Sequence, residues 1–145
     1  AFMKASIGAG NPIPFEGSVF ISVNNSDKMD IIPLARDLNE MGFSLIATTG
    51  TAKELERNGL DVEHVFKVGE GRPNIVDEIK NGHINLVINT PMGARSRFDE
   101  EAIGCACIQY GILAITTLSG ANAILRAIRS KQKPLQLNSL QNYHA

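Results

Sequence analysis

Residues 44–51 of the chain read SLIATTGT, and this stretch decides the fold. Its first part, residues 44–48, is a short apolar run with β-branched side chains, which predicts a buried strand. Gly50 permits a tight turn, and Thr51 followed by Glu54 has the spacing of a capping box. A second helix is therefore expected to follow Thr51 and to stop at Gly59. A strand that leads directly into a helix predicts an α/β unit.

The same unit recurs on both sides of this stretch. Further strands are expected at residues 18–23, 63–68, 84–89 and 112–116. Further helices are expected from Met29 or Asp30, from Pro73 to Lys80, from a cap at Ser96 to Tyr110, and from Ser119 to Pro134. Strands alternating with helices predict an α/β three-layer sandwich, with a five-stranded parallel sheet and helices on both faces.

Length and composition fit one soluble domain. The chain has 145 residues, of which 43% are hydrophobic and 20% charged, so it can build one core and is neither disordered nor a disulfide scaffold. Its net charge of -1 gives no overall attraction to nucleic acid or to an anionic membrane. No apolar run approaches a membrane span and no secretory signal is recognisable, so a cytoplasmic location is expected. Residues 1–16 resemble a linker from a preceding domain, and residues 17–145 the domain itself.

The cysteines and histidines give no sign of a metal site. Cys105 and Cys107 are two positions apart in an expected helix, where their side chains diverge, so we expect reduced core thiols. His64, His83 and His144 lack ligand spacing and are expected to be surface or structural residues. The domain is therefore expected to hold no metal and no cofactor.

Polar side chains follow nearly every expected strand. Because the carboxyl ends of parallel strands meet at one edge of the sheet, these side chains should line a common crevice. The helix that begins after the second strand offers free N–H groups to phosphate or carboxylate. The candidate residues for binding such an anion are Lys28, Thr48, Thr49, Gly50, Thr51, Lys67, Asn89 and Thr90.

The two lysines should supply most of the affinity. A helix terminus contributes about 0.3–1 kcal/mol to binding an anion, and a charge-assisted hydrogen bond about 1.5–3 kcal/mol. Two plainer interpretations stay open: Thr51 could only cap its helix, and Lys28 and Lys67 could be solvated surface charges.

Four segments, read in order, carry a resemblance to a known family. They are residues 22–28, 47–52 (ATTGTA), 67–73 (KVGEGRP) and 87–90 (VINT). With them the whole chain resembles the C-terminal methylglyoxal-synthase-like (MGS-like) domain of the carbamoyl phosphate synthetase large subunit. The resemblance implies the strand order 3-2-1-4-5 and an allosteric regulatory role. It implies that Lys28, Thr48, Thr51 and Lys67 bind the phosphate of an effector, with Asn89 near its base or ribose.

The resemblance also implies a larger setting. The effectors would be UMP and IMP, and possibly ornithine at the junction with the neighbouring domain. The parent chain would be an ATP-dependent ligase that uses Mg or Mn, works with a glutaminase small subunit and serves pyrimidine and arginine biosynthesis. The domain itself would not be an enzyme. Pro91 stands where a threonine often helps the nucleotide, and Ala114 where some members place a tyrosine against ornithine.

Two other functions are considered. A methylglyoxal-synthase-type lyase acting on dihydroxyacetone phosphate needs a carboxylate base after the third strand, where this chain has Arg72, with Glu70 two positions away. An assembly module without a ligand would show self-association instead.

Overall fold

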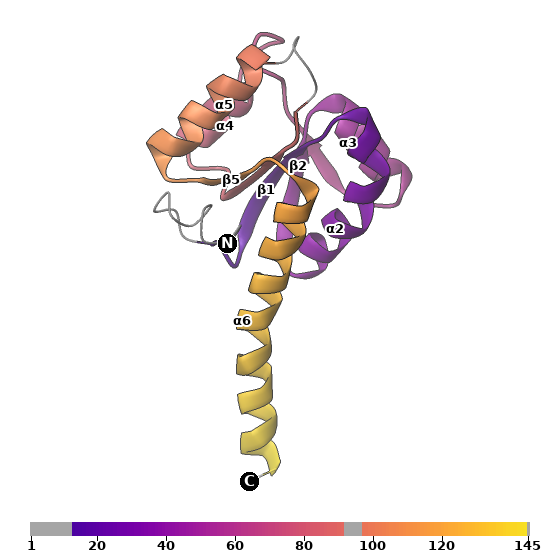
Figure 1. Ribbon diagram of the computed structural model, residues 1–145, viewed down its shortest axis with the longest axis vertical. Coiled ribbons are helices and arrows are strands. Elements are labelled where there is room, and N and C mark those ends of the chain that lie inside the picture. The colour runs from indigo at the N-terminus through magenta and orange to yellow at the C-terminus, as the bar shows by residue number, and fades with distance from the viewer. Residues whose placement is uncertain (1–12, 92–96, 145) are drawn as a thin grey trace.

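The structure, a computed structural model, describes residues 13–91 and 97–144, with residues 132–144 described by their backbone alone. Five parallel strands form one sheet in the order β3-β2-β1-β4-β5, as the resemblance implied (Figure 1). The strands are β1 (Gly17–Ser22), β2 (Phe43–Ala47), β3 (Val62–His64), β4 (Leu86–Asn89) and β5 (Leu113–Ile115). The helices are η1 (Asn25–Asp27), α2 (Lys28–Glu40), α3 (Thr49–Arg57), α4 (Ile75–Lys80), α5 (Arg97–Tyr110) and α6 (Leu118–His144).

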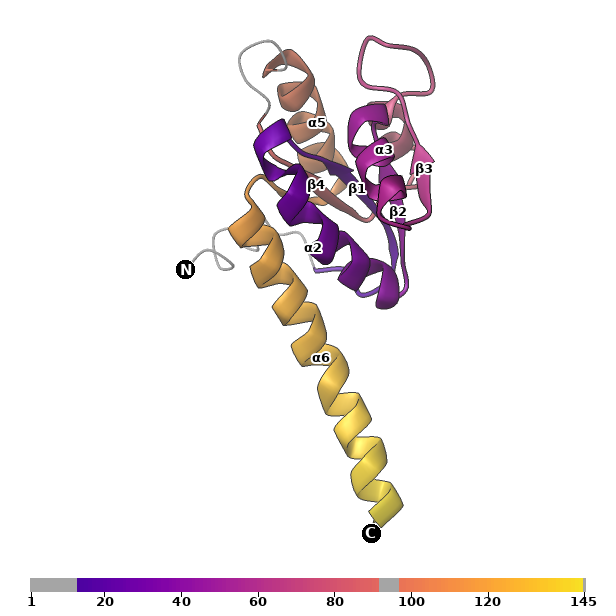
Figure 2. The same ribbon diagram turned by 90° about the vertical axis from the view of Figure 1, so that its right-hand side faces the viewer.

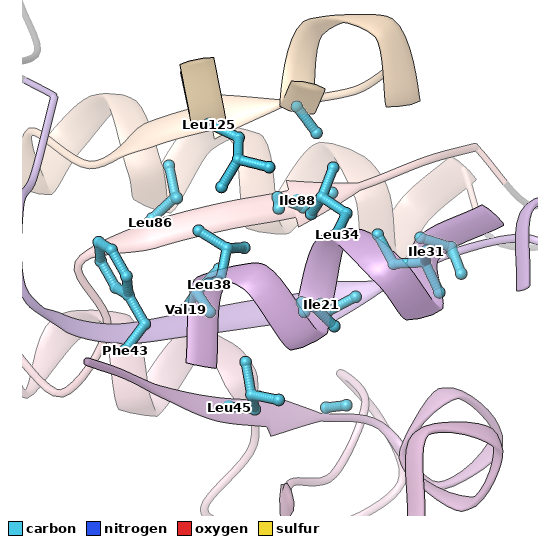
Figure 3. Packing of buried hydrophobic residues seen from close by; sticks show 14 of the residues in the cluster. Val19, Ile21, Ile31, Leu34, Leu38, Phe43, Leu45, Leu86, Ile88 and Leu125 are labelled. Carbon is cyan, nitrogen blue, oxygen red and sulfur yellow. The ribbon is translucent and has the colours of Figure 1, made fainter. Parts of the chain in front are cut away.

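Helices cover both faces of the sheet, which confirms the three-layer sandwich. Alternate residues of each strand point to opposite faces, and in β1 Val19 and Ile21 face one cluster while Phe20 faces the other. The larger cluster packs the sheet against α2, α3 and α6, through residues such as Leu34 and Leu125 (Figure 3). The smaller cluster packs it against α4 and α5. Burial on both faces explains why these strands are apolar throughout their length.

The third strand is shorter than predicted. β3 ends at His64, whereas the sequence predicted a strand over residues 63–68. β3 is an edge strand that pairs only with β2, and β2 ends at Ala47 opposite His64. Beyond that point the chain has almost no backbone partner, and a single bridge joins Phe66 to Asn74.

Two predicted helix boundaries at prolines are wrong. Pro73 does not open α4; the helix begins at Ile75, and Asn74 caps it in a capping box with Asp77. Pro134 does not end α6, which continues to His144 and extends away from the body of the domain (Figure 2). A proline removes one helical hydrogen bond without having to end a helix. The group left without a helical partner by Pro134 is the carbonyl group of Ser130, and this residue is exposed to water.

The two cysteines are both free, but only one is a core residue. Cys107 is buried in the smaller cluster, where burial raises the pKa of its thiol to about 12. Cys105 is exposed on α5, which corrects the prediction of two core thiols. Residues 1–12 of the predicted linker lie outside the described residues. Among the residues that are described, no helix is long and apolar enough to cross a membrane.

Candidate functional site: a crevice at the carboxyl edge of the sheet

The crevice lies where the strand order reverses. β1 is paired with β2 on one side and with β4 on the other, so the connections that follow β1 and β4 lead to opposite faces of the sheet. Ser22 and Asn89, the last residues of β1 and β4, are partners in the parallel ladder. Such a reversal leaves a gap at the carboxyl ends of the strands, where ligands of open α/β sheets bind.

Two adjoining lobes of about 300 Å³ each occupy this crevice. Thr48 and Lys67 line both lobes, and so they connect them. The first lobe is polar and is lined by Val23, Asn24, Asn25, Lys28, Thr48, Gly50, Thr51 and Lys67. Together the two lobes have a size typical of a small-molecule site.

Lys28 and Lys67 reach the first lobe from different segments. Lys28 is the first residue of α2, and its Nζ donates to Asn25 Oδ1 at 2.9 Å. Lys67 follows β3, in a turn where its backbone N–H donates to Glu70 Oε1 at 2.8 Å. Both side chains are partly buried. The structure thus brings together two cations that are far apart in the sequence.

The N-terminus of α3 also opens on the first lobe. α3 begins at Thr49 with Thr48 as its N-cap residue, so the predicted capping box at Thr51 and Glu54 is wrong. The Thr48 hydroxyl makes no capping hydrogen bond and lies 3.4 Å from Ser22 Oγ. The first N–H groups of a helix have no partner within it, so those of α3 remain available to an anion.

Gly50 has a different role from the one predicted. It is the second residue of α3 and has no positive φ, so it does not provide a left-handed turn. A Cβ at this position would lie 3.3 Å from Lys28 Nζ. A side chain at position 50 would therefore displace the lysine ammonium, which approaches the helix backbone closely.

Two predicted site hydroxyls hold neighbouring loops in place. Thr51 is buried and its Oγ1 accepts a hydrogen bond from Val23 N at 3.3 Å. Thr90 is also buried and its Oγ1 accepts from Asn24 N at 3.0 Å. Thr51 still lines the first lobe, whereas Thr90 lines neither lobe. These two bonds fix the loop after β1 to the first turn of α3 and to the residue that follows β4.

Thr49, another predicted site residue, faces away from both lobes. Its side chain is exposed and lines a separate hollow with Phe66 and Pro73. Its backbone N–H is the first of α3. Successive side chains of a first helical turn point in different directions, so the three threonines at 48, 49 and 51 cannot all face one ligand.

The second lobe combines an apolar floor with a polar rim. Its lining includes Phe20, Val68, Ile75 and Ile103, together with Ser22, Asn89, Asp99 and Glu100 and the shared Thr48 and Lys67. Asn89, for which the resemblance implied a place near a base or ribose, lines this lobe. The sequence analysis missed Asp99 and Glu100 as site residues, because acidic residues in the first turn of α5 also fit a purely structural role.

Arg72, which stands where the lyase needs its carboxylate base, and Glu70, two positions away, both lie outside the two lobes. Arg72 forms an ion pair with Asp77 at 2.8 Å, beside α4. The Glu70 carboxylate accepts the hydrogen bond from Lys67 N and is exposed.

Ala114, on β5, packs against the smaller core cluster. Pro91 is exposed, and its carbonyl oxygen accepts from Asn24 Nδ2 at 2.9 Å.

The histidines whose side chains are described pair with carboxylates on the surface. His64 lies 3.0 Å from Glu56 and His83 lies 2.9 Å from Glu78. Ser96, the predicted cap of α5, lies outside the described residues. Within the described part of the chain, no group of three or more His, Cys, Asp or Glu side chains is placed to hold a metal ion.

Fold and crevice together define a class of protein: a doubly wound parallel α/β domain with a cation-lined crevice at its topological switch point. A family model for the MGS-like domain matches residues 30–116, and the chain belongs to that family. In solved structures, the domain is similar to methylglyoxal synthase from Elizabethkingia anophelis, with a TM-score of 0.64, 19% identity and coverage of 78% of this chain and 79% of that one. At this identity the likeness concerns the fold alone.

The curated relatives that the chain matches are longer proteins. It is 45% identical over 99% of its length to the carbamoyl phosphate synthase large chain of Archaeoglobus fulgidus, and 47% identical over 100% to that of Acidobacterium capsulatum. It covers only 14% and 13% of these two relatives. It is also 45% identical over 99% of its length to the C-terminal section of that large chain from Methanopyrus kandleri, of which it covers 27%.

Proposed function

We propose that the chain is an allosteric regulatory domain of a carbamoyl phosphate synthase large chain, and that it binds a phosphorylated effector such as UMP or IMP in the crevice. The supporting observation is that Lys28, Lys67 and the uncapped N-terminus of α3 line one lobe. The relatives that are 45% and 47% identical to the chain support the proposed identity of the parent protein. The domain itself is proposed to be non-catalytic.

The effector's phosphate is assigned to the first lobe. There it accepts hydrogen bonds from the Lys28 and Lys67 ammonium groups and from the first N–H groups of α3. The rest of the effector extends past Thr48 into the second lobe, where its base lies on the floor of Phe20, Ile75 and Ile103. Asn89, on the rim, offers both a donor and an acceptor to the base or ribose.

Regulation follows if one state of the parent enzyme binds the effector better than another. A coupling free energy of about 1–3 kcal/mol between the crevice and a distant catalytic site changes affinity or activity about 5- to 150-fold. The parent is proposed to be an ATP-dependent cytoplasmic ligase of pyrimidine and arginine biosynthesis that uses Mg or Mn. Its synthetase domains and a glutaminase small subunit are the proposed partners. Ornithine is a further candidate effector.

Calorimetric titration of the 145-residue chain with UMP and with IMP tests this proposal. We expect Lys67→Ala to weaken binding about 10- to 100-fold, because it removes a charge-assisted hydrogen bond of about 1.5–3 kcal/mol. The matched control is Lys53→Ala: Lys53 is an exposed lysine of α3 that lines neither lobe, and its loss should leave affinity unchanged.

Three outcomes would contradict the proposal. The first is affinity for both nucleotides that is unaffected by Lys67→Ala. The second is self-association of the chain without any nucleotide binding, which would favour an assembly module. The third is production of methylglyoxal from dihydroxyacetone phosphate, which would favour the lyase. Glu70 does not line the crevice, so it is not placed to act as the base that the lyase needs after the third strand.

A further inference from the structure

The crevice carries opposite charges at its two ends. The first lobe has the ammonium group of Lys28, and Lys67 lies where the two lobes meet and lines both. The second lobe has the carboxyl groups of Asp99 and Glu100, in the first turn of α5. Since α2, which begins with Lys28, and α5 pack on opposite faces of the sheet, Lys28 and the two carboxyl groups reach the crevice from opposite helix layers. A phosphate held by the lysines therefore leaves the other end of its ligand next to two carboxylates.

These surroundings limit what the other end of the ligand can be. Ionised carboxylates accept hydrogen bonds but cannot donate them, so they suit hydroxyl or N–H groups. The floor of the lobe is apolar, and Phe20, Ile75 and Ile103 are all buried. A second anionic group there would lose hydration and face like charges in a region of lowered dielectric constant, both of which oppose binding.

We propose that Asp99 and Glu100 determine specificity: they restrict the effector to a phosphomonoester whose far end is uncharged and carries hydrogen-bond donors. This inference rests on the proposed function, because it assumes that the phosphate occupies the first lobe. A purely structural role for the two residues, as acidic groups that stabilise the N-terminus of α5, predicts no effect on ligand choice.

Three nucleotides that share the uridine 5′-phosphate core provide the test. UMP has one anionic end. Orotidine 5′-monophosphate adds a carboxylate to the base, and uridine 3′,5′-bisphosphate adds a phosphate to the ribose. We expect the native chain to bind both added-charge probes at least about tenfold more weakly than UMP, a difference of about 1.4 kcal/mol. Raising the salt concentration should narrow this difference, as it does for interactions between charges near a surface.

Neutral variants separate charge from size. The double variant Asp99→Asn with Glu100→Gln keeps the shape of both side chains, and we expect it to reduce the discrimination against the added-charge probes, relative to UMP, about tenfold. The matched control is Glu101→Gln, which removes one negative charge from an exposed residue of the same helix that lines neither lobe. It should leave the discrimination unchanged.

The outcomes distinguish this inference from the function on which it rests. If UMP does not bind to the native chain, both are refuted. If UMP binds and the added-charge probes bind equally well, only the charge selection is refuted. If the double variant discriminates against the added-charge probes as strongly as the native chain does, the discrimination is due to the size of the probes. That result would also refute the inference. The comparison of probes on the native chain does not depend on whether the variant folds.

Discussion

Gly50 matters because the ammonium group of Lys28 lies close to its backbone. The sequence suggested that Gly50 is needed for a tight turn, but it lies within α3 and has no positive φ. Its missing side chain matters because Lys28 Nζ comes so close that an added Cβ would be 3.3 Å away. The side chain of Lys28 is flexible and can shift by a few tenths of an ångström, so we expect the fold to tolerate a methyl group here.

Gly50→Ala should therefore separate binding from stability. Alanine suits a helix better than glycine by about 0.5–1 kcal/mol, so the free energy of unfolding should not fall. The displaced Lys28 ammonium should weaken UMP binding severalfold, measured by calorimetry. The control is Gly104→Ala in α5, where an added Cβ meets nothing within 4 Å. An unchanged affinity in Gly50→Ala would show that the ammonium position is unimportant.

At the scale of elements, α4 depends on its cap. α4 spans only Ile75–Lys80, and Asn74 and Asp77 hold its first turn in a capping box. Arg72 donates to the Asp77 carboxylate from outside the helix. The pKa of the Asp77 carboxyl is held below its usual value, first by this hydrogen bond and then by that from Asn74 N. The lowered pKa shows that the ionised form of Asp77 stabilises the folded state.

The stability contributed by Asp77 should depend on pH. It is fully present above the unfolded-state pKa of an aspartate, about 3.9, and is lost as pH falls through the lower pKa of the folded state. Below about pH 4, the melting temperature of the native chain should fall more steeply than that of Asp77→Asn. Arg72→Gln, which keeps the bond from Asn74, should give an intermediate slope. Equal slopes in the native chain and in Asp77→Asn would contradict this account.

On the scale of the whole molecule, α6 packs on the domain with its first half, the part of the helix whose side chains are described. Its residues Ala121, Ile124, Leu125 and Ile128 are buried against the sheet and α2. Arg129 pairs with Asp37 of α2 at 2.9 Å. Beyond these contacts the helix axis leaves the body of the domain (Figure 2). Among the residues whose side chains are described, the last of α6 to contact the domain is Lys131, whose Nζ lies 5.8 Å from the centre of the Phe15 ring.

A chain that ends at Lys131 should keep the stability of the full chain. We expect the free energy of unfolding in urea to change by no more than about 0.5 kcal/mol, as for surface changes in general. By contrast, Ile128→Ala in the full chain should cost about 2–5 kcal/mol, because it opens a cavity in the larger core cluster. Loss of cooperative unfolding in the shortened chain would show that residues 132–145 contribute to the fold.

Much of the crevice could be predicted from the sequence because parallel strands place their carboxyl ends at one edge. Once the strands were located, Lys28, Thr48, Lys67 and Asn89 had to lie near one another. The helix starts near Thr51 and Pro73 and the helix end near Pro134 were less predictable, because a helix boundary depends on backbone direction as well as on residue type. At the second strand the chain uses Thr48 as N-cap instead of Thr51.

The sequence by itself determined the strands, their parallel arrangement and the edge at which the cations gather, since these depend on local patterns of side chains. Only the tertiary structure decided how each side chain points: Thr49 outward, Thr90 onto Asn24 N, and Asp99 and Glu100 into the second lobe. These directions depend on contacts between segments that are distant in the sequence. A linear pattern carries no record of which distant backbone will stand opposite a given side chain.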